Sequence, residues 1–418
     1  MFLPPKSRFR IQSSFSAYIK MIFATLIGKL EPGKNNVLLE KRIMELFRIE
    51  NAYTVNQARV GIYLAIRAVI SKQKNEIILS PYTIFDVVNM VICAGGKPVF
   101  VDIEKETCNI DPKKIGNKIN DNTAAVMATH LHGVPCDMKL ISKICKKNQI
   151  YLIEDSAQAF GVPYEDKFLG TVGDIGIYSF GLFKTVNSFF GGLVVCHDKA
   201  LMERMKSFTK NFGTNPKTKI LKRIIQSVIF DIAATPIVFK LFTFWIFRYG
   251  YLSGNPYLNK LTRSENNPVL KTEFPEEYKN LMSNVQASIA LKQLDQVQNK
   301  MKIRQNIASV YFEGLKSNKN ISMPPDSPQN GNGCLQYPIQ VENRHDFLVY
   351  LARKGRDCAP QHIRNCADLD MYKEYYKDCP VARKTAKSVI ILPTYIQYGL
   401  KEAYKNVNIL SSFGSNAK

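Results

Sequence analysis

A carboxylate and a lysine stand 29 positions apart in surroundings that suit covalent cofactor chemistry. Asp155 follows the apolar run 151–153, and Lys184 comes shortly before the glycine pair Gly191–Gly192. A pyridoxal phosphate enzyme needs a carboxylate that keeps the pyridine nitrogen protonated, so that the ring can withdraw electrons. It also needs a lysine that carries the cofactor as a Schiff base. The pair therefore predicts pyridoxal phosphate chemistry.

The elements that must position this pair form a repeating pattern between Glu76 and Cys196. Helix-like stretches, such as 138–148, separate the first four of six short apolar runs. Strands without polar alternation, spaced by helices, indicate a largely parallel sheet that is covered on both faces. The last two runs are joined through the turn that bears Lys184, which predicts an antiparallel strand. The runs are Ile77–Leu79, Pro98–Val101, Ala124–Met127, Tyr151–Ile153, Ile175–Tyr178 and Leu193–Val195.

The C-terminal part of the chain predicts helices followed by a smaller mixed domain. Apolar residues between 281 and 316 recur at helical spacing, which indicates one long helix or two. Prolines from Pro324 to Pro328 and the turn 330–333 then break the pattern. We expect residues 334–418 to form a small α+β domain.

Length and charge limit the class of protein. A chain of 418 residues can hold two or three domains with cores of their own. The formal net charge of +22 attracts polyanions such as nucleic acid, anionic lipid or a phosphorylated substrate. The sequence contains no zinc-finger spacing and no RRM-like aromatic motif. We therefore expect no nucleic acid partner and favour an anionic membrane surface.

Cysteine usage indicates the compartment. The nine cysteines are scattered and lack any C-x-x-C pair, which is typical of reduced thiols in the cytoplasm. Neither a disulfide framework nor a metal site is expected. The first residues lack the apolar region of a cleavable signal peptide. We therefore expect a cytoplasmic protein, peripheral on the inner face of the cytoplasmic membrane.

Two apolar segments do not fit an ordinary soluble enzyme. In the first, apolar residues from Phe15 to Leu30 recur at i, i+3, i+4 and i+7, which places one stripe along a helix. This stripe is equally typical of membrane contact and of a core or subunit-swapped helix. The second segment, Ile224–Leu252, follows a run of lysines and arginines that begins at Arg204.

The second segment is unsuited to a simple membrane span. Such a helix needs ~20 mostly apolar residues, whereas Asp231, Pro236 and Lys240 interrupt this run. We expect two short helices, broken at Thr235–Pro236, that lie in the headgroup region with basic residues on anionic lipid. The alternatives are a buried helical hairpin and a dimer contact.

A series of motifs extends from about Glu31 to Phe413. They are Ser80–Thr83, Ala94–Asp102, Asn109–Pro112, His130–Pro135, Glu154–Asp155, Ser179–Lys184, Gly191–Gly192, Met282–Ala287 and Leu392–Pro393. In order and spacing this series resembles the DegT/StrS family of sugar aminotransferases, which are fold-type I pyridoxal phosphate enzymes. One motif alone would be a weak signal, but the ordered series is strong.

The resemblance implies an α/β fold with a three-layer, mostly parallel sheet and a smaller C-terminal α+β domain. On this basis we expect an N-terminal amphipathic segment at 1–30 and a large pyridoxal phosphate-binding domain at 31–205. A basic and apolar insertion, for which membrane association is one interpretation, is expected at 206–270. Residues 271–418 are expected to form the long helix and the small domain.

The resemblance also assigns roles to four residues. Lys184 would hold the cofactor and then move a proton between the donor carbon and the cofactor. Asp155 would pair with the pyridinium nitrogen, and Gln158 would hydrogen-bond the 3-oxygen of the ring. Ser179 would donate to the cofactor phosphate.

The phosphate site departs from the family pattern. Many members place a Ser-Gly-Thr turn at a helix N-terminus to bind the phosphate through backbone N–H groups. Here Gln57-Ala58-Arg59 stands at that position. We therefore expect Ala58 at the turn and the charged guanidinium group of Arg59 to bind the phosphate. The Asn that often reaches the phosphate across the dimer appears as Lys279, and the neighbouring Arg appears as Leu281.

The residues around the ring and the substrate also differ. The ring-stacking aromatic of the family appears as Ile84, with Phe85 next to it, and either one could cover the ring. Phe190 stands in place of an acidic residue before Gly191. His130 and His132 either shape the site or are structural. His362 stands where the small domain approaches the substrate in the family.

Some relatives replace the lysine with histidine and catalyse dehydration, so Lys184 favours transamination. The resemblance implies a homodimer that transfers an amino group, from L-glutamate, to a keto-sugar on a nucleotide or lipid carrier. The product would enter a cell-surface polysaccharide or glycolipid. The changed phosphate site leaves one alternative, a membrane-associated, catalytically altered homologue that acts as a scaffold or regulator. Another is a pyridoxal phosphate enzyme with a lipid-chain substrate.

Overall fold

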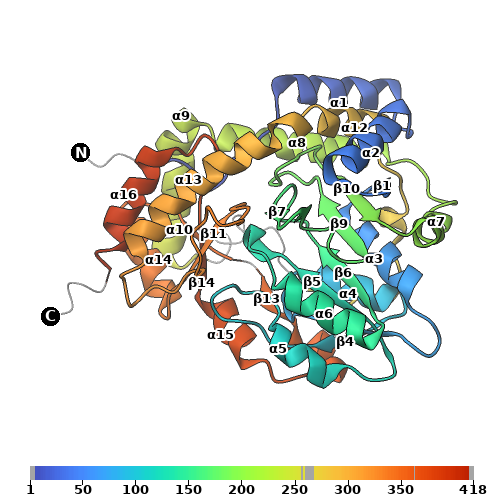
Figure 1. The fold of residues 1–418 in the computed structure, drawn as a ribbon. Coiled ribbons are helices and arrows are strands. Elements are labelled where there is room, and N and C mark those ends of the chain that lie inside the picture. The colour runs from blue at the N-terminus through green and yellow to red at the C-terminus, as the bar shows by residue number, and fades with distance from the viewer. Residues whose placement is uncertain (1–4, 256–257, 259–267, 362, 414–418) are drawn as a thin grey trace.

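Seven strands form the central sheet of the computed structural model, which describes residues 5–255, 258, 268–361 and 363–413 (Figure 1). Their order is β1-β10-β9-β6-β5-β2-β4. The strands are β1 (Asn51–Val55), β2 (Glu76–Leu79), β4 (Lys97–Phe100), β5 (Thr123–Thr129), β6 (Tyr151–Asp155), β9 (Ile175–Ser179) and β10 (Gly192–Cys196). Six of these strands are the apolar runs predicted from the sequence.

Strand β10 runs antiparallel to both β1 and β9, whereas the other neighbouring pairs are parallel. The antiparallel strand after the lysine-bearing turn is therefore confirmed. Strand β1 was not predicted, because Asn51, Tyr53 and Thr54 interrupt its apolar residues. It is recognised only through its pairing with β10, which lies far away in the sequence.

Helices cover both faces of the sheet and so make three layers. Alternate residues of one strand face opposite layers: Ile77 and Leu79 pack with α3, α4 and α7, whereas Ile78 packs with α5 and α6. Helices α2 and α12 cover the other end of that second face, over Leu193 and Val195 of β10. The helices are α2 (Lys34–Phe47), α3 (Ala58–Val69), α4 (Phe85–Cys93), α5 (Pro112–Ile115), α6 (Met138–Asn148), α7 (Lys199–Ser207) and α12 (Asn284–Leu291).

The C-terminal part has its own core around a small antiparallel sheet in the order β11-β14-β12. The expected helix over 281–316 is two helices, because the turn η5 (Leu294–Gln296) separates α12 from α13 (Val297–Leu315). The other elements are β11 (Tyr337–Gln340), α14 (Arg344–Arg353), β12 (Ala359–Pro360), α15 (Pro380–Ser388), β14 (Val389–Leu392) and α16 (Leu400–Leu410). Short pairs join β3 (Tyr82–Thr83) to β13 (Arg364–Asn365) and β7 (Pro163–Tyr164) to β8 (Lys167–Phe168).

The second apolar segment forms a bent helical arm. It comprises α8 (Lys217–Ala233), α9 (Pro236–Val238), the wide turn η3 (Phe239–Thr243) and α10 (Phe244–Ser253). The break falls at Thr235–Pro236, as predicted, and the two limbs meet at 62°. Within the described part of the chain no single helix is long and apolar enough to cross a membrane. The two limbs of the bent pair reach the length and apolar composition of a membrane span only when they are taken together.

The first apolar segment forms α1 (Phe15–Ile27), which ends at Gly28 with φ of 75°, a left-handed value that favours glycine. The helix packs Ala17 and Met21 against α8 and leaves the large residues outside. Phe15 is 80% exposed and Phe23 is 62% exposed. The alternative in which this apolar stripe is packed in the protein core is therefore wrong.

The exposed residues of α1 continue onto the helical arm. We call this surface the outer apolar face. In Figure 1, α1, α8 and α9 lie along one edge of the molecule. The outer apolar face consists of Phe15, Ile19, Phe23 and Leu26 of α1, Ile225, Ile229 and Ile232 of α8, and Ile237, Leu241, Phe242, Trp245 and Ile246 of the second limb, all at least 41% exposed.

Candidate active site

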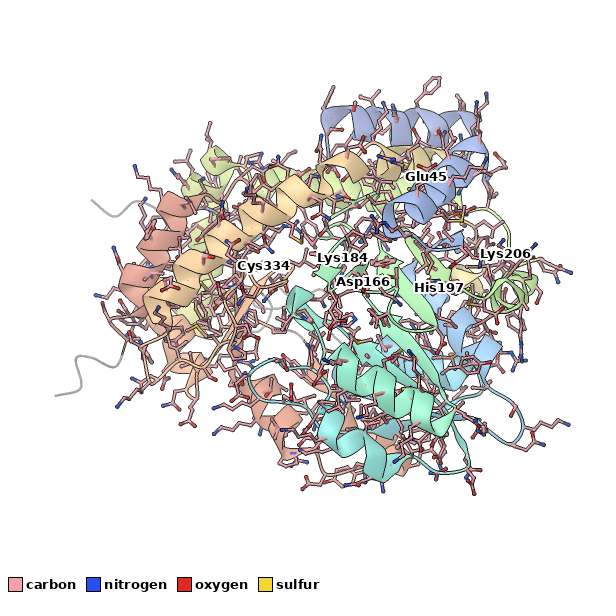
Figure 2. The ribbon with its side chains drawn as sticks, viewed as in Figure 1. Glu45, Asp166, Lys184, His197, Lys206 and Cys334 are labelled. Carbon is pink, nitrogen blue, oxygen red and sulfur yellow. The ribbon has the colours of Figure 1, made fainter. Side chains whose placement is uncertain are left out.

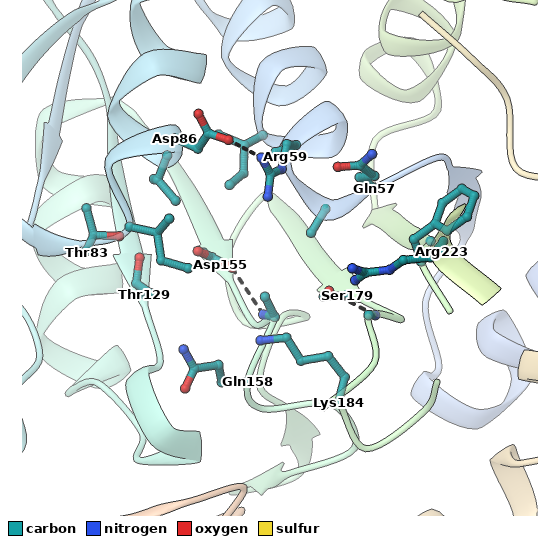
Figure 3. A pocket seen from close by; sticks show the side chains of 18 of the residues that line it. Gln57, Arg59, Thr83, Asp86, Thr129, Asp155, Gln158, Ser179, Lys184 and Arg223 are labelled. Carbon is teal, nitrogen blue, oxygen red and sulfur yellow. Dashed lines mark hydrogen bonds and ion pairs between the residues drawn. The ribbon is translucent and has the colours of Figure 1, made fainter. Parts of the chain in front are cut away.

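A cavity of about 440 Å³ opens where the carboxyl ends of β5, β6 and β9 meet the first turn of α3 (Figure 3). Ligands of parallel α/β proteins bind at this edge of the sheet. Figure 2 shows Lys184 between the central sheet and the domain that contains Cys334. The cavity is lined by Gln57, Ala58, Arg59, Ile62, Thr83, Ile84, Asp86, Val87, Thr129, Leu131, Asp155, Ala157, Gln158, Ser179, Gly181, Lys184, Phe190, Gly191, Lys219, Lys222, Arg223 and Gln226.

Asp155 and Lys184 face the same cavity from neighbouring strand ends. Burial raises the pKa of the Asp155 carboxyl, and the N–H of Ala157, at 3.1 Å from Oδ1, opposes that shift. Burial lowers the pKa of Lys184 to about 8, against the attraction of Asp155. A lysine that loses its proton near neutrality can act as a nucleophile, as covalent attachment of a cofactor requires.

The lowered pKa of Lys184 predicts how cofactor attachment depends on pH. Only the neutral amine attacks an aldehyde, so attachment of pyridoxal phosphate to the apoenzyme should accelerate about tenfold per pH unit below about 8 and then level off. A lysine with its ordinary value of 10.5 would still accelerate above pH 9. Stopped-flow absorbance after mixing apoenzyme with pyridoxal phosphate would measure the profile, and a rise that continues to pH 10 would contradict it.

Gln158 is held with its amide directed by the backbone. The N–H of His132 donates to Gln158 Oε1 at 2.8 Å, so the Nε2 group is the donor left to face the cavity. His132 has φ of 61°, an unusual value for a non-glycine residue. The backbone at His132 therefore positions the Gln158 side chain, while a role for the His132 imidazole stays a prediction.

The start of α3 forms the opposite wall of the cavity. The first turn of a helix leaves backbone N–H groups without intrahelical partners, and the N-cap Gln57 makes no side-chain cap here. Gly192 allows β10 to approach this turn, since a Cβ there would lie 2.7 Å from the nitrogen of Ala58. Ser179 accepts from the N–H of Gly181 at 3.3 Å, which leaves its hydroxyl proton for an acceptor in the cavity. These groups fit a phosphate.

Arg59 reaches the cavity but is shared with a carboxylate. It forms an ion pair with Asp86 and donates to the hydroxyl of Tyr278 at 2.9 Å. Lys271 lies 2.9 Å from Asp86 as well. Although burial works against the charged carboxylate, the Arg59 and Lys271 cations hold the pKa of Asp86 below its usual value. Asp86 was missed in the sequence, because a lone Asp in the first turn of a helix is more often only a dipole partner.

The remaining predicted residues are placed as follows. Ile84 and Phe85 both pack against the core, but of the two only Ile84 lines the cavity. Phe190 lines the cavity. Lys279 lies outside this cavity, paired with Glu276, and its contact with a partner subunit's cofactor stays a prediction. His362 lies outside the described residues.

Glu154, next to Asp155, is a fully buried anchor. Its carboxylate accepts backbone N–H groups from Gly170 at 2.8 Å, Val172 at 2.7 Å and Gly173 at 2.6 Å. His130 completes the set: Nε2 lies 3.1 Å from Glu154, while Nδ1 accepts from the N–H of Cys136. His130 is therefore structural, and this network fixes the strand end that carries Asp155.

Replacement of this anchor should destabilise the protein. Glu154→Gln puts an amide group where a carboxylate accepts four donors, so at least one buried N–H group loses its acceptor. We expect the free energy of unfolding to fall by about 2–4 kcal/mol. The matched change Glu165→Gln, in an exposed turn, should alter it by less than about 0.5 kcal/mol. Chemical denaturation would measure both, and equal effects would contradict the anchor role.

One wall of the cavity comes from α8 and was not foreseen. Lys219, Lys222, Arg223 and Gln226 line the cavity, although the sequence suggested only a lipid contact for this basic stretch. Figure 3 shows Arg223 beside Ser179 and Gln57. Nothing in the linear sequence links residue 223 to residue 179, so this wall could be found only from the fold.

A parallel-sheet α/β fold with a lysine, an aspartate and a helix N-terminus around one cavity defines a fold-type I pyridoxal phosphate-dependent enzyme. The chain belongs to the DegT/DnrJ/EryC1/StrS aminotransferase family, whose model matches residues 16–235 and 262–410. It is a family of pyridoxal phosphate-dependent sugar aminotransferases. Residues 236–261, which include α9 and η3, fall outside the match. The expected domain boundaries at 30, 205 and 270 stay predictions.

Similar proteins include enzymes of nucleotide-sugar metabolism. The dTDP-4-amino-4,6-dideoxy-D-glucose transaminase of Shigella dysenteriae is 28% identical over 372 residues, which cover 87% of this chain and 86% of that protein. The GDP-perosamine synthase of Escherichia coli O157:H7 is 37% identical over 169 residues, but these cover only 40% of this chain and 46% of that enzyme.

A solved structure supports the fold. Helicobacter pylori PseC, an aminotransferase involved in pseudoaminic acid biosynthesis, superimposes with a TM-score of 0.74 at 20% identity. The superposition covers 98% of this chain and all of that one. The predicted fold class is confirmed, with its mostly parallel sheet and small C-terminal sheet.

Proposed function

We propose that this protein transfers an amino group from L-glutamate to a keto-sugar on a nucleotide or lipid carrier, for a cell-surface polysaccharide or glycolipid. The observation that carries the proposal is the convergence of Lys184, Asp155, Gln158 and Ser179 on one cavity. The named relatives act on nucleotide-linked sugars, which supports a sugar acceptor here. Lys184, in place of histidine, favours transamination over dehydration.

When bound, pyridoxal phosphate supplies an electron-withdrawing ring. Asp155 holds a proton on the ring nitrogen, and the pyridinium charge in turn offsets the burial that raises the pKa of this carboxyl. Gln158 would donate from Nε2 to the ring oxygen. Lys184 would hold the cofactor, and its free amine would serve as the base for the proton at the donor carbon.

Other residues would hold the cofactor phosphate and the substrates. Ser179 and the turn at Ala58 bind the phosphate, with Arg59 at its side. The carboxylates of L-glutamate suit a cavity whose outer wall carries Lys219 and Arg223.

The absorbance of the purified protein with pyridoxal phosphate tests the donor half of this proposal. L-glutamate alone should convert the band of the lysine-bound cofactor to that of its amine form and release 2-oxoglutarate, while D-glutamate should do neither. A folded protein that binds no cofactor would overturn the proposal and favour a scaffold or regulator.

We also propose a homodimer that lies on anionic membrane through the outer apolar face. Exposed apolar patches of this extent are typical of docking surfaces, and cations on α8 suit anionic headgroups. Trp245, on the outer apolar face, is the only tryptophan and so a clean reporter. Brominated phospholipid in phosphatidylglycerol vesicles should quench its emission. No quenching, together with a dimer that buries Trp245, would assign this face to the subunit contact.

A further inference from the structure

Helix α8 has an inner face that ties it to the active site. Ile220, Ile224 and Ser227 are buried, and the two isoleucines pack in one core with Phe189 and Phe190. Phe190 itself lines the cavity. The helix is therefore fixed against the catalytic loop.

A second face of α8 presents cations to the cavity. We call Lys219, Lys222 and Arg223 the α8 cation row. Lys219 donates to the carbonyl of Glu277 at 2.7 Å, and Arg223 donates to that of Phe189 at 3.3 Å and to Gln226 Oε1 at 2.9 Å. The carboxylate of Glu277 attracts Lys219, but among the described residues no carboxylate forms an ion pair with this row. Its positive charge is only partly offset, as expected of a site for a polyanion.

Burial, together with the nearby Arg59, lowers the pKa of both Lys219 and Arg223. Arg59 therefore lies close enough to Lys219 and to Arg223 to repel both. A bound anion would relieve this repulsion. The cofactor phosphate has its own donors at Ser179 and the turn at Ala58. The amino donor leaves before the sugar acceptor binds, so in the second half-reaction the row is open to an anionic group of the acceptor.

The third face of α8 belongs to the outer apolar face and borders the cation row directly. Successive residues of an α-helix are rotated by about 100°, so Lys222 and Ile229, seven positions apart, point in directions that differ by about 20°. They lie about 10 Å apart along the helix axis. Ile229 is 58% exposed, and Ile225 stands beside it. A ligand with a charged group next to an apolar chain would contact both faces of α8 at once.

The acidic residue of this helix does not interrupt the apolar surface. Asp231 is half-buried and accepts a hydrogen bond from Tyr18 of α1 at 2.5 Å. Burial raises the pKa of the Asp231 carboxyl, which Tyr18 and Arg10 oppose. In the sequence, the charge of Asp231 interrupts the apolar run of this segment. In the structure, its carboxylate is turned to α1, away from the outer apolar face.

We infer that the sugar acceptor is carried on a lipid diphosphate, with the diphosphate on the α8 cation row and the lipid chain on the outer apolar face. This inference rests on the proposed aminotransferase function and selects between its two carriers. A nucleoside diphosphate would use the cation row but would leave the apolar residues beside Lys222 without a role.

Vesicle binding by the holoenzyme tests the carrier. Phosphatidylcholine vesicles that contain a polyprenyl diphosphate should bind at least about tenfold more tightly than vesicles of equal charge made with phosphatidylglycerol. Lys222→Gln should weaken the diphosphate-dependent part about fivefold. Lys143→Gln, an equally exposed change on α6, should leave it unchanged. Co-sedimentation and Trp245 emission would give the two readouts.

Three results would overturn the inference. Equal binding to both kinds of vesicle would leave only a general electrostatic surface. A cofactor spectrum that responds to soluble dTDP, UDP or GDP, but not to the polyprenyl diphosphate, would assign a nucleotide carrier. Loss of pyridoxal phosphate affinity in Lys222→Gln would assign the row to the cofactor phosphate.

The donor reaction separates this test from that of the proposed function. If L-glutamate converts the cofactor and the polyprenyl diphosphate does not bind, the inference about the carrier fails and the aminotransferase stands. If L-glutamate produces no conversion, the proposed function fails, whatever the vesicles show.

Discussion

Lys184→Ala should abolish transamination, with a fall in kcat on the order of 10⁴-fold or more. The substitution removes both the amine that holds the cofactor and the group that moves the proton, and proton transfer alone contributes about 10²–10⁴-fold. Lys184 is the lysine of the cavity that pairs electrostatically with Asp155, and burial lowers its pKa to about 8. Lys219 and Lys222 of α8 line another wall of the cavity, so neither occupies the place of Lys184 beside Asp155.

Covalent attachment gives a readout that is independent of turnover. Borohydride treatment of the wild-type holoenzyme should fix the cofactor on one peptide, and Lys184→Ala should leave no labelled peptide in a mass spectrum. Lys167→Ala, at an exposed position of β8, serves as the matched control and should retain label and activity. Label on another lysine in the Lys184→Ala protein would refute the assignment of Lys184.

The sheet and its catalytic edge could be predicted because their signals are local. A short apolar run is visible in the sequence, as at 151–153, where Leu152 and Ile153 are buried, and Asp155 ends the same strand. Strand β1 was missed because its pattern of polar and apolar residues is typical of a loop, and only the distant β10 makes it a strand.

The cavity wall could not be predicted for a different reason. Asp86 becomes part of the site through Arg59, and Arg223 through its place beside Ser179. These pairs are brought together by packing between distant segments, which no spacing rule encodes. The apolar stripe of α1 shows a further limit: the periodicity predicted the helix but left open which side is buried. Small residues such as Ala17 take the buried side and Phe15 the exposed one.

Asp155→Asn should lower kcat by about 10²–10³-fold, as expected for the loss of one preorganised electrostatic contact. The amide cannot hold the ring nitrogen in its protonated form, so the ring withdraws fewer electrons from the donor carbon. Asp155 is buried, and its oxygen also accepts the N–H of Ala157, which an Asn oxygen can still accept. The fold should therefore survive the change, and thermal unfolding would verify this.

The same substitution should change cofactor attachment in a predictable direction. Asp155 attracts the Lys184 ammonium and so raises the pKa of Lys184 against the effect of burial. Removal of the carboxylate leaves burial unopposed, so the midpoint of attachment should move below about pH 8. Asp155→Asn would thus attach the cofactor at lower pH while it turns over more slowly. A misfolded protein would lose both properties together, and a midpoint that moves upward would show that Asp155 does not act on Lys184.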